Sequence, residues 1–251
     1  GEQLTYPLST DVLYHQLWRK YILDDSMRTV DKERLLALMD AMVTTMYKRQ
    51  ELSVHLREFE TDFSFELQYL FSHELLLKTK SNQIHFFHQT LFDYVYARRF
   101  TEKGYNLLEV LKRQHQGLFS RAAVKSILTF LREQSPKEYI HIIDQLLYAQ
   151  NDDGKDTYRY HLKSLALSNM AFFETPLNDE INFISRKVFQ DNIYMDVLYE
   201  SVHTPNWFKA IWEIMESKGG WKCLSKNYKE KTMLMSKRTL LLCAEIVLDK
   251  L

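Results

Sequence analysis

The stretch "QIHFFHQTLFDYVYARRF" (residues 83–100) decides how the first part of the chain folds. It opens with an apolar run, QIHFF (83–87), and a second apolar run, ELLLK (74–78), precedes it across the polar turn TKSN (79–82). Two apolar runs on either side of a short polar turn are typical of a β-hairpin. We therefore predict a hairpin that leads directly into a helix.

The elements around this hairpin follow a recognisable order. Residues 31–50 and 63–73 each carry apolar side chains at helical spacing, and a short segment near 52–59 lies between them. After the hairpin, the sequence predicts a helix over 90–103 that ends at Gly104, because glycine readily adopts the backbone conformation that closes a helix. Helix, short segment, helix, hairpin and helix is the order of a winged-helix domain.

The composition predicts a mainly α-helical protein. Only six glycines and four prolines occur in 251 residues, and 45% of the residues are hydrophobic, which favours long helices around a sizeable core. Lys plus Arg and Asp plus Glu number 33 each, so the chain lacks the broad positive field of a general nucleic-acid binder. No apolar run reaches the roughly 18 residues of a membrane span, and two cysteines make no disulfide framework. We expect no membrane association and a cytoplasmic location.

The second part of the chain reads as a series of helices. Proline after Ser or Thr marks helix starts at 135, 175 and 204, and Ser135 with Glu138 fits a capping box. Each interval between these starts holds about two helices, which is the rhythm of a HEAT-like two-helix array. An irregular helical bundle is the alternative. The expected helices cover 118–134, 136–150, 156–173, 177–190, 193–202, 205–217 and 231–250.

Motifs for self-contained catalysis are missing from the sequence. A P-loop needs glycine at the position of Ala149 and Ser or Thr at the position of Asp156, on either side of the pair Gly154-Lys155. His73-Glu74 has Leu77 where a zinc protease needs its second histidine. We therefore expect that this chain by itself is not an enzyme, has no catalytic residues and binds no metal.

The segment Phe86-Phe87-His88-Gln89-Thr90-Leu91-Phe92-Asp93-Tyr94-Val95-Tyr96-Ala97 resembles the end of the winged-helix domain in STAND NTPases, especially their NACHT branch. The family pattern is F-x-H-x-[ST]-[FL]-x-[DE]-[FY]-x-x-A, and each defined position is met. Residues 8–22 also resemble the helical linker that precedes the winged helix in this family. The resemblance implies three regions: a helical linker over 1–28, a winged-helix domain over 29–104 and a HEAT-like helical domain over 105–251.

The resemblance implies that His88 senses nucleotide. In such proteins a winged-helix histidine contacts the β-phosphate of ADP bound in a neighbouring P-loop domain, and the contact holds the closed, resting form. Phe86, Phe92 and Val95 would be core residues that fix the position of the ring. Asp93 is interpreted as a local packing or hydrogen-bonding residue. Arg98 and Arg99 are interpreted as a solvated helix face, with contact to an acidic partner as the alternative.

The implied function is regulatory. Walker motifs are absent and the chain starts with Gly1, so we expect a piece of a longer protein whose upstream P-loop domain binds ADP or ATP with Mg²⁺. The piece itself would hold no cofactor. The implied partners are that P-loop domain, a protein ligand or downstream effector recognised by the helical domain, and further copies of the protein in an oligomer formed on activation.

Two other functions compete with this interpretation. One is a helical protein-interaction scaffold without nucleotide coupling, in which His88 merely caps or packs. The other is a winged-helix DNA-binding regulator. The helix over 63–73 would then enter the major groove, yet it carries no Lys or Arg to contact phosphates, so we expect no nucleic-acid partner.

Overall fold

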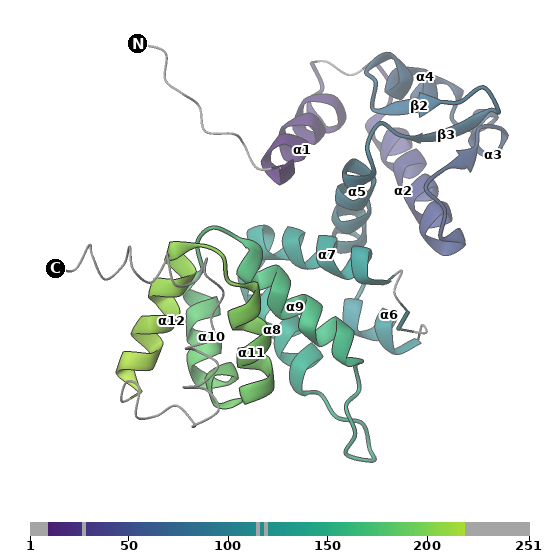
Figure 1. Cartoon of the computed structure of the whole chain (residues 1–251). Helices are drawn as coiled ribbons and strands as arrows, with labels where there is room; N and C mark the ends of the chain where they lie inside the picture. Colours follow the sequence, from purple (N-terminus) through teal and green to yellow (C-terminus); the bar gives the residue numbers. More distant parts are fainter. Residues whose placement is uncertain (1–9, 27–28, 114–115, 118–119, 219–251) are drawn as a thin grey trace, which may run out of the picture. The chain divides into compact units, whose positions relative to one another are not determined.

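The computed structural model describes residues 10–26, 29–113, 116–117 and 120–218 (Figure 1). In these ranges the chain is mainly α-helical and contains one small antiparallel sheet. It divides into two compact units, one formed by residues up to 106 together with 118–130, the other by 107–117 and the residues from 131 on. The helix predicted over 231–250 lies outside the described residues, and the domain boundaries at 28 and 104 stay predictions.

The sheet of the first unit contains the predicted hairpin and a strand that was not predicted. Strands β2 (Leu76–Lys78) and β3 (Gln83–Phe86) pair antiparallel, with Leu76 opposite Phe86. Strand β1 (Val54–His55) pairs with the other edge of β3, so the strand order is β1-β3-β2. A strand of two residues is too short to produce an alternating pattern, and only its pairing with β3 reveals it.

In its described residues up to 106, the first unit also contains helical segments that the sequence largely predicts. Helix α2 starts where Asp31 accepts a hydrogen bond from the Arg34 N–H at 2.9 Å, and it ends at Gln50, whose φ of 58° is left-handed. The helical segments are α1 (Thr10–Trp18), its π-helical continuation η1 (Arg19–Leu23), α2 (Lys32–Arg49), α3 (Arg57–Glu60), α4 (Ser64–Ser72) and α5 (Gln89–Glu102).

Helices α2 and α5 pack together and form the core of the first unit. The five apolar side chains of α2 that mark its helical period are all at most 1% exposed: Leu35, Leu38, Met39, Met42 and Met46.

Helix α5 ends as predicted. Gly104 has a φ of +68°, its N–H bonds the Thr101 carbonyl at 2.9 Å, and the Tyr105 N–H bonds the Phe100 carbonyl at 3.2 Å. Such paired bonds, with a ring contact between Phe100 and Tyr105, form a Schellman motif.

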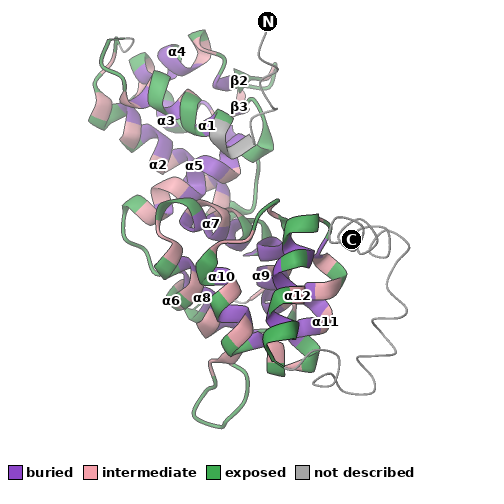
Figure 2. Cartoon of the chain, turned by 90° about the vertical axis from the view of Figure 1, so that its left-hand side faces the viewer, coloured by how far each residue is buried: buried purple, intermediate pink, exposed green. Residues whose placement is uncertain are grey.

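As far as residue 218, the described part of the second unit consists of helices in two rows. Helices α6, α8, α10 and α12 contact one another in succession, whereas α9 packs on α8 and on α11. Helix α12 shows the pattern of these helices clearly, with exposed residues (green) along one face and buried residues (purple) along the other (Figure 2). The elements are α6 (Leu107–Arg113), α7 (Ser120–Gln134), which belongs to both units, α8 (Pro136–Tyr148), α9 (Tyr160–Phe172), α10 (Asn178–Arg186), the 3₁₀ turn η2 (Val188–Gln190), α11 (Asn192–Ser201) and α12 (Pro205–Ser217).

Two of the three predicted helix starts are confirmed in position. Helix α8 begins at Pro136, and α12 begins after Thr204, whose hydroxyl accepts a hydrogen bond from the Trp207 N–H. The capping box at Ser135 is wrong, because the ψ of 73° at Ser135 lies outside the extended geometry of a capping residue and its side chain makes no cap bond. The start at Thr175 is also wrong: α10 begins at Asn178, and the Thr175 hydroxyl accepts a hydrogen bond from Asn206 instead.

A buried ion pair joins three helices of the second unit. The Arg132 guanidinium on α7 donates to both carboxylate oxygens of Glu180 on α10, at 2.7 and 2.9 Å, and Glu180 is fully buried. Tyr139 on α8 donates to the same carboxylate at 3.0 Å, and the Leu177 N–H at the start of α10 donates at 2.6 Å. Burial raises the pKa of Tyr139, so its hydroxyl remains a donor. Each carboxylate oxygen of Glu180 therefore accepts two hydrogen bonds.

We predict that Glu180→Ala destabilises the second unit by about 3–5 kcal/mol, because it leaves the Arg132 charge buried without its partner. The matched control is Asp144→Asn, which removes a partly exposed ion pair between α8 and the end of α10 and should cost less than about 1 kcal/mol. Urea unfolding followed by circular dichroism measures both. Equal losses for the two variants would contradict the role of the buried pair.

Candidate functional site

His88 lies at the junction between strand β3 and helix α5 and is the N-cap residue of the helix. Its backbone is extended, with φ −144° and ψ 144°, and its side chain is exposed. The ring atom Nδ1 accepts a hydrogen bond from the Thr90 N–H at 3.2 Å. Since a backbone N–H can only donate, Nδ1 carries no proton, and the neutral ring carries its proton on Nε2. His88 thus presents one N–H donor at the exposed start of α5.

A chain of hydroxyl groups continues from His88 to helix α1. The Thr90 hydroxyl lies 2.8 Å from His88 Nδ1, and the Tyr14 hydroxyl on α1 bonds the Thr90 hydroxyl in turn. Because the unprotonated Nδ1 can only accept, Thr90 donates to His88 and Tyr14 donates to Thr90. The arrangement brings together Tyr14, Thr90 and His88, and the sequence reading missed Tyr14.

The apolar support of His88 is buried, as predicted. Phe86, Phe92 and Val95 are 3%, 5% and 0% exposed, and the rings of Phe86 and Phe92 lie 6.0 Å apart. Phe87 is different, because it is 39% exposed beside the His88 ring, with the ring centroids 6.4 Å apart. The surface next to His88 is therefore partly apolar.

Arg98 and Arg99 do not form the solvated helix face that the sequence suggested. Arg99 donates to both carboxylate oxygens of Asp40 on α2, at 2.7 and 2.9 Å, and to Glu102 at 2.6 Å. Arg98 pairs with Glu102 at 2.7 Å, and its guanidinium lies over the Trp18 ring, 5.1 Å from the centroid. Both side chains are only 12% exposed. The interpretation was wrong because Asp40 of α2 and Trp18 of α1 cover these side chains, and neither contact can be read from the periodicity of α5, which shows only Glu102.

Asp93 is a half-buried carboxyl group on α5. Burial raises its pKa from 3.8 to about 6, although the positive charge of Lys125 on α7 acts in the opposite direction. The ionised carboxylate therefore carries a cost in the folded chain near neutral pH.

Helix α4, which would be the DNA-contacting helix of a winged-helix regulator, presents no positive charge. Its outward side chains include Phe65, which is 73% exposed, whereas Glu66 is buried and pairs with Arg34 of α2 at 2.7 Å. The exposed lysines of this region, Lys78 and Lys80, belong to the hairpin. A pocket of about 620 Å³ lies beside α4 and is lined by Thr29, Val30, Asp31, Phe65, Glu66, Gln68, Tyr69, Ser72 and His73.

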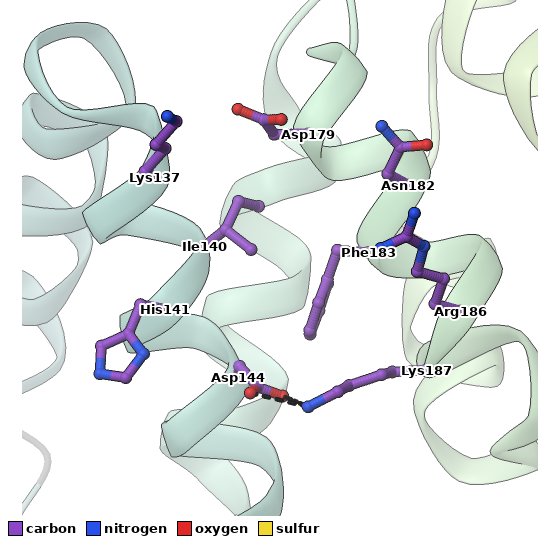
Figure 3. Close-up of a pocket in the computed structure, with 9 residues that line it drawn as sticks. All are labelled: Lys137, Ile140, His141, Asp144, Asp179, Asn182, Phe183, Arg186 and Lys187. Atoms are coloured by element: carbon purple, nitrogen blue, oxygen red, sulfur yellow. Dashed lines mark hydrogen bonds and ion pairs between the residues drawn. The ribbon is translucent and has the colours of Figure 1, made fainter.

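The second unit has a groove of its own, about 410 Å³ in volume, between α8 and α10 (Figure 3). Ile140 and Phe183 form its apolar floor, and the ion pair of Asp144 with Lys187, at 2.6 Å, crosses one end. The remaining lining residues are polar or charged: Lys137, His141, Asp179, Asn182 and Arg186. The groove suits a partner that offers both an apolar and a charged side chain.

Neither a metal centre nor a membrane span is found in the described part of the chain. No group of three or more His, Cys, Asp or Glu residues there could hold a metal ion. No described helix combines the length and the apolar character that crossing a bilayer requires.

Comparison with known proteins adds no assignment: no protein-family model, curated protein or solved structure matches this chain.

We predict that Asp93→Asn stabilises the chain at pH 7.5 by about 1–2 kcal/mol, less than the whole pKa shift implies because the carboxyl is partly exposed. The folded pKa of Asp93 lies above the unfolded value, so its contribution to the free energy of unfolding falls as the pH rises from about 4 to about 6. The gain over wild type should therefore shrink toward pH 4. Urea unfolding at several pH values tests this.

The control for Asp93 is Asp152→Asn in the exposed loop after α8, which should change stability little at any pH. A gain from Asp93→Asn that does not vary with pH would show that packing, and not ionisation, explains it.

Proposed function

We propose that this chain is the regulatory segment of a STAND-type ATPase switch of the NACHT-like branch. The exposed His88 Nε2–H, at the N-terminus of α5, is the observation that carries the proposal. His88 would sense ADP bound in a P-loop domain elsewhere in a longer protein. That P-loop domain would supply the Mg²⁺ site, most nucleotide contacts and the ATPase chemistry, and this chain would itself be no enzyme.

The physical chemistry of the site suits an anion. The backbone N–H groups of the first turn and the helix dipole favour negative charge at a helix N-terminus, and a ring N–H adds a directed donor. A hydrogen bond to a charged oxygen is about twice as strong as one between neutral groups. A phosphate oxygen that meets His88 would therefore be stabilised more in the closed form than in a form in which the P-loop domain has moved away.

The arrangement of the first unit supports a winged-helix assignment. Helices α2, α3 and α4 precede the hairpin β2–β3, and β1 completes a sheet of order β1-β3-β2. The hairpin corresponds to the wing, and α5 follows it with the F-x-H-x-[ST] sequence at its start. This order of elements and this motif are the features in which the chain resembles STAND NTPases.

The helix packing of the second unit supports the proposal that it is a HEAT-like array, which recognises a partner or holds the protein inactive. Helices in two rows, each contacting the next member of its row, are expected of stacked helix pairs. The groove between α8 and α10 offers an apolar floor with charged rims, which suits a segment of a protein ligand, of an effector, or of a further copy in an activated oligomer.

A scaffold without nucleotide coupling is the second candidate, and the capping bond favours it. His88 accepts a hydrogen bond from the Thr90 N–H, and an N-cap residue needs no ligand to explain its presence. In the switch the His88 Nε2–H donates to a phosphate oxygen of ADP, whereas in the scaffold it binds no nucleotide. A substitution that keeps the helix cap but removes the imidazole ring distinguishes the two functions.

We predict that His88→Asn, made in the complete protein, weakens ADP binding about tenfold or more, which corresponds to roughly 1.4 kcal/mol. Asparagine is among the best N-cap residues, so this variant removes the imidazole and keeps the helix start. His88→Ala should weaken ADP binding equally and in addition destabilise the first unit by about 0.5–2 kcal/mol. Isothermal titration calorimetry and urea unfolding measure the two effects.

The scaffold is supported instead if ADP affinity stays unchanged in both variants while only His88→Ala loses stability. A complete protein that binds no nucleotide at all would reject the STAND assignment itself.

A further inference from the structure

Helix α1 is fastened to the His88 junction by both aromatic and polar contacts. Tyr14 is 4% exposed, and its ring contacts those of Phe87 and Tyr94, with centroids 6.4 and 5.8 Å apart. Trp18, one turn further along α1, is 3% exposed and also contacts Tyr94, at 6.4 Å. Helices α1 and α5 thus pack together, and α1 lies beside the start of α5 (Figure 1).

The polar contact within this packing has a fixed direction. Tyr14 donates to Thr90 and Thr90 donates to His88 Nδ1, because Nδ1 is already the acceptor of the Thr90 N–H. A proton on Nδ1 would remove the acceptor of the Thr90 N–H and point two N–H groups at each other. The chain of bonds therefore holds the ring in the tautomer that carries its proton on Nε2, and in one rotamer.

We infer that Tyr14 and Thr90 are positioning residues that couple helix α1 to the His88 ring. While α1 is packed on α5, the Tyr14 hydroxyl donates a hydrogen bond to the Thr90 hydroxyl, which in turn donates to His88 Nδ1. When α1 moves away, Thr90 loses the Tyr14 donor and its hydroxyl is free to rotate. Only the Thr90 N–H then holds Nδ1 as an acceptor, so the second tautomer of the His88 ring becomes more populated. Whether α1 is packed on α5 therefore determines how often the His88 ring carries its proton on Nε2.

The nucleotide consequence of this coupling rests on the proposed function. If His88 binds a phosphate oxygen, then displacement of α1 weakens that bond without any direct contact between α1 and the nucleotide. Because linkage is reciprocal, a phosphate bound at Nε2 would also favour the packed position of α1. Displacement of helix α1 would then destabilise the closed, resting form.

The positioning role is tested in the 251-residue chain, without nucleotide, by long-range ¹H–¹⁵N spectra of the histidine rings at pH 8. Wild type should show His88 with the proton on Nε2. Tyr14→Phe keeps the ring contacts of Tyr14 but removes its hydroxyl, and Thr90→Val removes the next hydroxyl. Each should raise the population of the Nδ1–H tautomer about 2–10-fold, the effect of one lost hydrogen bond.

Two further variants make the comparison specific. Thr90→Ser restores the hydroxyl and should restore the wild-type spectrum. Tyr69→Phe removes a different tyrosine hydrogen bond, the one from Tyr69 on α4 to the Tyr21 carbonyl on η1 at 2.8 Å. Because η1 continues α1 but this bond does not involve Thr90, the His88 spectrum should stay unchanged. Unaltered His88 nitrogen shifts in folded Tyr14→Phe and Thr90→Val would overturn the positioning role.

ADP affinity in the complete protein then separates this inference from the function on which it rests. We expect Tyr14→Phe to weaken ADP binding about 2–10-fold. If the His88 spectrum changes but not even His88→Asn affects ADP, the positioning role stands and the proposed function fails. If His88→Asn weakens ADP binding and Tyr14→Phe does not, the coupling of α1 to the nucleotide is rejected.

Discussion

The direct passage from strand β3 into helix α5 is the constraint on which the first unit depends. Only Phe87 and His88 separate the last strand residue from the first helical one. The Phe87 N–H still bonds the Leu75 carbonyl of the hairpin at 3.2 Å, and His88 caps the helix. With no loop to absorb movement, the start of α5 cannot shift without disturbing the sheet, so the His88 ring is tied to both.

Helix α5 is enclosed on several sides, whereas helix α12 of the second unit keeps one exposed face. Tyr94 of α5 contacts Trp18 of α1 and Phe130 of α7, and Arg99 reaches Asp40 of α2. A helix buried around most of its surface is well suited to holding a side chain at its end in one position. In the second unit, a groove with an apolar floor lies between α8 and α10.

Much of the architecture could be predicted from local signals. Helical spacing located α2 and α8, the flanked turn located the hairpin, and Gly104 marked the end of α5, because each depends on residues close together in the chain. Strand β1, the contacts of Arg98 with Trp18 and of Arg99 with Asp40, and the hydroxyl of Tyr14 escaped prediction. Each is defined by a residue far away in the sequence, and Tyr14 and Thr90 are 76 positions apart.

For the candidate site, the sequence by itself determined that a histidine starts a helix after an apolar strand, since capping and periodicity are local properties of the chain. Only the tertiary structure decided which ring nitrogen of that histidine accepts a hydrogen bond and which one carries the proton. The packing of α1 on α5 brings Tyr14 to Thr90, Thr90 fixes Nδ1 of the exposed His88 as an acceptor, and the ring proton is left on Nε2. The direction of a hydrogen bond depends on which groups meet, and that meeting is a property of the fold.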